Sequence, residues 1–130
     1  MTLLYLVVDP RTGELACATA GHPPPRIVAP GKSPETVVVS GLALGIEGDQ
    51  SYEAARLTLE PGAAAVLFTD GLLEARRDGE LFGEERLDEA LVRHSGLPAG
   101  ELARALADDC RAFAGDLGDD LAIVVLKLPA

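Results

Sequence analysis

The chain has 130 residues, of which 48% are hydrophobic, and this is enough for one domain with its own core. The formal net charge of −10 disfavours nucleic acids and anionic membrane surfaces as binding partners. The two cysteines, Cys17 and Cys110, have neither metal-binding nor redox spacing, which favours buried thiols in a reducing compartment. The sequence shows no signal-peptide pattern and no apolar run of bilayer-spanning length, so we expect a cytoplasmic protein.

The N-terminal half of the chain is predicted to form antiparallel strands. Residues 2–8 are an unbroken apolar run, which predicts a strand covered on both faces. A turn at residues 9–13 leads into the alternating residues 14–20, so these two strands are expected to form a hairpin. Further strands are predicted at residues 26–29, 36–39, 54–59 and 63–68.

The C-terminal half changes to a helical period. Residues 84–94 and 98–114 carry apolar side chains at helical spacing, and Gly96 and Gly115 are placed to end these helices. A last strand is predicted at residues 121–128. Antiparallel strands followed by helices and one final strand predict a single α+β domain built of antiparallel sheet layers flanked by helices.

Carboxylates stand at the ends of two predicted strands. Asp70 ends the apolar run that precedes it, whereas Asp119 and Asp120 come just before the last strand. If these strands are antiparallel neighbours, their carboxylates meet at one edge of the sheet and would repel one another unless a cation bridges them. Oxygen ligands favour Mg²⁺ or Mn²⁺ over zinc. Ordinary turns explain Asp-Gly and Asp-Asp equally well, so spacing leaves both interpretations open.

The order of several motifs resembles one protein family. The motifs are AGHPPP, LALG, a Pro-Gly turn, LFTDGLLEA, LFGEERL and a DD pair before an apolar strand, and they extend over nearly the whole chain. This order is similar to the PPM-type metal-dependent serine/threonine phosphatases, in the SpoIIE-like branch of bacterial stress and sporulation regulators. The resemblance implies two packed antiparallel sheets flanked by helices.

The resemblance also implies a chemistry and a set of site residues. In the family, two Mg²⁺ or Mn²⁺ ions activate a bridging water that attacks the phosphorus of a phosphoserine in line. By this resemblance Asp70 and Asp119 are metal ligands, and Gly71 allows the turn that presents Asp70. By the same resemblance Asp120 is a second-shell or structural residue. His22 in AGHPPP suggests a general acid, whereas the rigid triple-proline turn beside it favours a structural histidine that orders the loop. No residue of this chain is assigned as a catalytic acid or base.

The matched region corresponds to only the C-terminal half of the family's domain. The family's N-terminal half carries Gly-Asp and Asp-Gly motifs that supply the aspartate bridging the two metals. Gly48-Asp49 and Gly115-Asp116 are the available substitutes, and neither follows a suitable apolar strand. We therefore expect a metal-dependent protein serine phosphatase domain that is incomplete in this chain. The alternatives are an inactive, phosphatase-derived module that acts through protein–protein contacts and a structural remnant with no role at the site.

The expected partners follow from the same two lines of reasoning. The resemblance implies a phosphorylated regulatory protein as substrate, such as an anti-sigma-factor antagonist. An apolar strand at residues 2–8 without its flanking strands would leave an open sheet edge. We therefore expect a homodimer whose interface includes Leu3, Leu4, Leu6 and Val7, or the strands that they pair with.

Overall fold

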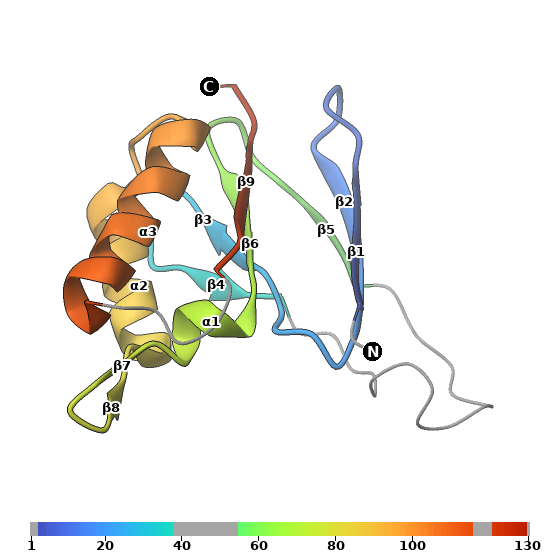
Figure 1. The fold of residues 1–130 in the computed structure, drawn as a ribbon. Helices are drawn as coiled ribbons and strands as arrows, with labels where there is room; N and C mark the ends of the chain where they lie inside the picture. Colours follow the sequence, from blue (N-terminus) through green and yellow to red (C-terminus); the bar gives the residue numbers. More distant parts are fainter. Residues whose placement is uncertain (1–2, 38–54, 116–120, 130) are drawn as a thin grey trace, which may run out of the picture.

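The computed structural model describes residues 3–37, 55–115 and 121–129. Within these ranges the chain forms antiparallel sheets and helices, so the predicted α+β class is confirmed. Figure 1 shows the layers: the helices lie against one sheet, and a second sheet lies on the other side of that sheet. The predicted LALG loop at residues 42–45 lies outside the described residues. None of the helices in the described ranges is long and apolar enough to cross a membrane.

The first sheet contains the predicted N-terminal hairpin. Its strand order is β1-β2-β5, with bounds β1 Leu3–Val8, β2 Glu14–Ala20 and β5 Ala55–Thr58. β1 and β2 pair antiparallel, with Tyr5 opposite Ala18. Gly13 in the connecting turn has φ +80°, and a Cβ there would collide with the Leu59 carbonyl oxygen. Only glycine therefore allows this turn to lie against the chain that follows β5.

The second sheet is the one that the helices cover. Its strand order is β4-β3-β6-β9, with bounds β4 Glu35–Thr36, β3 Arg26–Val28, β6 Ala64–Phe68 and β9 Ile123–Lys127. All of its described pairings are antiparallel. β6 lies between β3 and β9, and this central position explains why its sequence is almost wholly apolar.

Two long helices follow β6, and both begin and end close to the predicted residues. Their bounds are α2 Gly83–His94 and α3 Ala99–Ala114. The buried residues of each helix recur every three or four positions, namely Leu87, Ala90 and Leu91 in α2 and Leu102, Leu106 and Cys110 in α3. Gly115 follows α3 with φ +75°, as predicted for a glycine that ends a helix.

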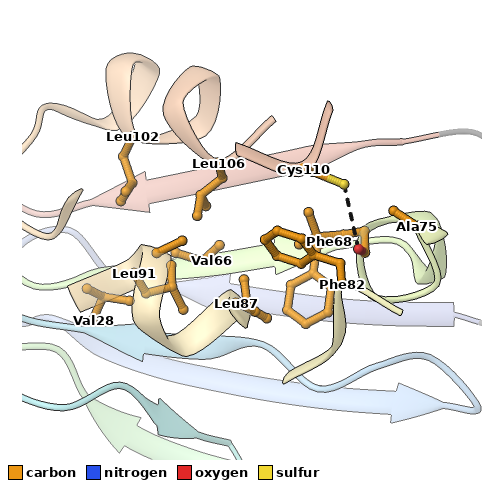
Figure 2. Packing of buried hydrophobic residues seen from close by; sticks show 12 residues of the cluster. Val28, Val66, Phe68, Ala75, Phe82, Leu87, Leu91, Leu102, Leu106 and Cys110 are labelled. Carbon is orange, nitrogen blue, oxygen red and sulfur yellow. Dashed lines mark hydrogen bonds between the residues drawn. The ribbon is translucent and has the colours of Figure 1, made fainter. Parts of the chain in front are cut away.

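The described residues form two hydrophobic cores, one on each face of the second sheet. The core under the helices, shown in Figure 2, includes Val66 and Phe68 of β6 together with the buried side chains of α2 and α3. The core between the two sheets includes Ala65 of β6 and Leu15 and Cys17 of β2. Successive side chains of β6 thus enter opposite cores, so this strand is fixed from both faces.

The described residues cover only one face of β1. The prediction that this strand is covered on both faces is therefore wrong for the described part of the chain. Leu4, Leu6 and Val8 pack on the core between the sheets. Leu3, Tyr5 and Val7 point the other way and are 49%, 61% and 48% exposed. An unbroken apolar run does not report which of its faces is covered, and here only one face meets a sheet.

Three short elements lie between β6 and α2, and of their features the sequence predicts only the hairpin-type turn at Asp78-Gly79. α1 (Asp70–Leu73) is a single helical turn that begins directly after β6. β7 (Arg76–Arg77) and β8 (Glu80–Leu81) form a small hairpin. Its two turn residues, Asp78 and Gly79, have φ angles of 51° and 85°, as a hairpin-type Asp-Gly turn requires. The other differences are small shifts of strand ends, and residues 38 and 39 of the predicted strand 36–39 lie outside the described ranges.

Candidate functional site

The end of β6 is where the sequence places its acidic site. β6 pairs with β9, and Phe68 lies opposite Ile123. The residue after Phe68 and the residue before Ile123 therefore lie side by side at the same edge of the sheet. Asp70 comes shortly after β6 in sequence. Asp119 and Asp120 come shortly before β9 and lie outside the described residues, so the expected meeting of these carboxylates with Asp70 stays a prediction.

Asp70 is the first residue of α1 and is exposed. Within the described ranges no hydrogen bond or ion pair engages its carboxylate, and its backbone carbonyl accepts the Glu74 N–H at 2.9 Å. Gly71 is buried inside the same turn and is not among the residues with a left-handed backbone. The turn that presents Asp70 therefore does not require glycine's conformational freedom.

α1 is held in place from α3. The thiol of Cys110 donates a hydrogen bond to the Leu72 carbonyl oxygen at 3.7 Å (Figure 2). Burial raises the pKa of both Cys110 and Cys17, so both stay as neutral thiols, which agrees with the prediction of buried thiols. A neutral buried thiol at position 110 serves packing and this one hydrogen bond.

His22 contacts the end of β6 from the loop that follows β2. Its Nε2 donates to the Phe68 carbonyl oxygen at 2.9 Å, and the contact is partly buried. Phe68 is two residues before Asp70, so the imidazole holds the strand end and not the carboxylate. The role predicted for His22, ordering this loop next to the site, stays a prediction.

Thr69 links the end of β6 to the residue before β9, and no signal in the sequence marks it. Its N–H donates to the Ala122 carbonyl oxygen at 3.1 Å. Ala122 in turn donates its N–H to the Thr69 side-chain oxygen at 3.0 Å. A threonine before Asp-Gly is unremarkable in sequence, and only the pairing of β6 with β9 reveals the contact.

Arg26 of β3 contacts the same strand end from the side that α2 covers. Its side chain is 2% exposed, and it forms ion pairs with Glu84 at 3.1 Å and Asp88 at 3.2 Å, both on α2. Its guanidinium carbon lies 5.8 Å from the centre of the Phe68 ring. The neighbouring residues Ile27 and Val28 suggest only a strand, so no local signal marks a buried cation here.

The arginines nearest to Asp70 in sequence have different surroundings. Arg77 stacks on the Phe113 ring at 4.5 Å, and Arg86 lies 4.4 Å from the centre of the same ring. Arg76 is exposed and has no side-chain partner in the described ranges. Arg77 is therefore engaged within the fold, whereas the Arg76 side chain is exposed.

The described residues do not by themselves complete a metal site. No group of three or more His, Cys, Asp or Glu side chains placed to hold a metal occurs among residues 3–37, 55–115 and 121–129. Asp70 offers the kind of oxygen ligand that Mg²⁺ and Mn²⁺ prefer. A site at this edge therefore fits the cation in ligand type, and its other ligands have to come from outside the described residues.

Comparisons with known proteins identify the fold and the family. The family model "Stage II sporulation protein E (SpoIIE)" matches residues 1–129. The chain is 26% identical over 129 residues to the phosphoserine phosphatase RsbU of Bacillus subtilis, covering 98% of this chain and 38% of RsbU. Among solved structures, the PP2C domain of SiaA from Pseudomonas aeruginosa superposes with a TM-score of 0.83 at 25% identity, covering 98% of this chain and 51% of that one.

A further solved structure is the Mn-presoaked phosphatase domain of SpoIIE from Bacillus subtilis. It superposes with a TM-score of 0.72 at 20% identity, covering 98% of this chain and 56% of that one. The chain thus spans little more than half of these two solved domains and 38% of RsbU. The predicted family resemblance is confirmed, and the chain belongs to the SpoIIE family of PP2C-type phosphatase domains.

Proposed function

We propose that this chain is the C-terminal half of a metal-dependent phosphoserine phosphatase domain. The observation that carries the proposal is the position of Asp70, an exposed carboxylate without a partner among the described residues, at the paired ends of β6 and β9. The similarity to the phosphoserine phosphatase RsbU along the whole chain supports the same reaction.

The proposed metal ligands are Asp70 and Asp119, with Asp120 and His22 in supporting positions. A Mg²⁺ or Mn²⁺ ion bound there supplies an activated water for attack on phosphorus. The chain's own contribution is to hold Asp70 at the sheet edge. The hydrogen bond from His22 to Phe68 and the two bonds between Thr69 and Ala122 fix the backbone of the two residues just before that position.

The substrate that we propose is a phosphoserine on a regulatory protein, such as an anti-sigma-factor antagonist. The family membership supports this class of substrate. Exposed Arg76, six residues after Asp70, is our candidate to receive the phosphate. We place the protein in the cytoplasm, because Cys17 and Cys110 are both buried and unpaired.

The proposal is tested by hydrolysis of p-nitrophenyl phosphate with Mn²⁺, by the chain alone and with an added N-terminal half of a family domain that carries the Gly-Asp and Asp-Gly motifs. We expect slow hydrolysis by the chain alone and a clear gain with the added half. Asp70→Asn abolishes this gain, whereas the matched change Asp78→Asn in the β7–β8 turn keeps it.

Two results would contradict this proposal in different ways. A fast Mn²⁺-dependent rate by the chain alone, lost in Asp70→Asn, would show that this half is sufficient for catalysis. No rate in either arrangement would favour the inactive binding module instead.

A further inference from the structure

Thr69 occupies the point where β6 changes into α1. A regular antiparallel pair of this kind exchanges two backbone hydrogen bonds, each residue giving its N–H to the other's carbonyl oxygen. Thr69 and Ala122 keep the first of these bonds, from the Thr69 N–H to the Ala122 carbonyl, at 3.1 Å. The second bond is different, because the Ala122 N–H is donated to the Thr69 Oγ1 at 3.0 Å.

The backbone carbonyl of Thr69 has another role. It accepts the N–H of Leu72 at 3.1 Å, and this bond helps to form the single turn of α1. A carbonyl that bends away into a helical turn normally leaves its partner strand without an acceptor. Here the hydroxyl of the same residue takes the place of the carbonyl. Consistently, the Thr69 side chain does not cap α1, although the residue stands at the N-cap position.

We propose that Thr69 is a positioning residue, which lets the chain turn at Asp70 while the segment that follows Asp119 and Asp120 stays attached to the end of β6. The inference rests on the proposed function, since it concerns how the two strand ends beside the proposed ligands are joined. Ala122 is two residues after Asp120 in sequence, and the Thr69 hydroxyl holds Ala122 itself at the end of β6. A residue without a hydroxyl would keep the strand, the turn and the bond from its own N–H to the Ala122 carbonyl, but would lose the second bond of this pair.

The test uses Thr69→Val, which keeps the shape of the side chain and removes the acceptor. Thr69→Ser keeps the hydroxyl, and Thr58→Val makes the same chemical change at the exposed end of β5. The first measurement is amide hydrogen exchange at Ala122. We expect Thr69→Val to accelerate it about two- to tenfold, the range that one hydrogen bond is worth, with Thr69→Ser and Thr58→Val close to the unchanged chain.

The second measurement is the paramagnetic broadening of backbone amides during a Mn²⁺ titration. In the unchanged chain we expect the amides next to Asp70 and those of Leu121 and Ala122 to broaden together. Thr69→Val should require about two- to tenfold more Mn²⁺ for the same broadening, and Thr69→Ser should not.

The outcomes separate this inference from the proposed function. The positioning role would be overturned if Thr69→Val left the amide exchange rate at Ala122 unchanged, or if Thr69→Ser accelerated this exchange as much as Thr69→Val does. This holds even where Mn²⁺ broadens the amides beside Asp70. Equal Mn²⁺ requirements of Thr69→Val and the unchanged chain would do the same. Absence of any broadening near Asp70 in the unchanged chain would overturn the proposed metal site, and the role of Thr69 in that site with it.

Discussion

The buried cation behind the strand end allows a sharp prediction about stability. Arg26 is 2% exposed, whereas its partners Glu84 and Asp88 are 69% and 44% exposed. The two sides of this ion pair are therefore unequal. Removing the arginine leaves two carboxylates that water already solvates, but removing the carboxylates leaves a guanidinium inside the protein.

The magnitudes follow from this asymmetry. We expect the double variant Glu84→Ala/Asp88→Ala to lose about 3 kcal/mol in the free energy of unfolding, because a buried charge without its partners costs about 3–5 kcal/mol. The lower end applies because the exposed face of α2 can admit some water. Arg26→Met fills a similar volume without charge and should change stability by less than about 1 kcal/mol. The buried Nη1 of Arg26 also has no hydrogen-bond partner among the described residues, and the methionine removes that defect.

Urea unfolding followed by circular dichroism gives the free energy of unfolding of each variant, and variants are compared where their m-values agree. The matched control is Glu85→Ala/Glu89→Ala, which removes two exposed carboxylates from the same helix and should stay within about 0.5 kcal/mol of the unchanged chain. Equal losses of unfolding free energy in Arg26→Met and in Glu84→Ala/Asp88→Ala would refute the reasoning. They would mean that the ion pair as a whole stabilises the fold, and that burial of the cation does not make its partners more important than the arginine itself.

Two further predictions concern pH and assembly. Burial pushes the pKa of Asp109 up, but hydrogen bonds from Arg93 and His94 outweigh it and hold this pKa below the ordinary value of 3.8. The carboxylate therefore stabilises the fold above that pH, and this contribution is lost as the pH falls through the lowered pKa. In urea unfolding measured at a series of pH values, Asp109→Asn should reduce the loss of stability towards acid pH. The same loss in Asp109→Asn as in the unchanged chain would contradict this. The proposed homodimer is tested by light scattering at micromolar concentration. Tyr5→Asp/Val7→Asp, on the exposed face of β1, should yield a monomer of unchanged fold, whereas a monomeric unchanged chain would end the dimer proposal.

The structure also changes how the dimer is best tested. The predicted interface residues Leu4 and Leu6 face the core between the sheets, and charges there would unfold the chain. Leu3 and Val7 remain exposed and suitable for an interface. Alternation along a strand therefore separates the residues that hold the fold from those available to a partner.

The sequence by itself determined the order and type of the main elements. Apolar runs, helical periods and turn residues such as Gly115 and the Asp78–Gly79 pair are local signals, because each reflects the backbone geometry of a few consecutive residues. The placement of Asp70 at a strand end is of the same local kind. The motif order identified the family for the same reason, since a motif is a short stretch with a fixed local geometry.

The tertiary structure alone decided which of these residues meet. The exchange of a hydroxyl for a carbonyl at Thr69 exists only because β6 pairs with β9, more than fifty residues away in sequence. Arg26 is buried only because α2 brings Glu84 and Asp88 to β3. The exposed face of β1 likewise depends on which sheet covers it. Such contacts join distant segments, and a local pattern in either segment does not contain the geometry of the pair.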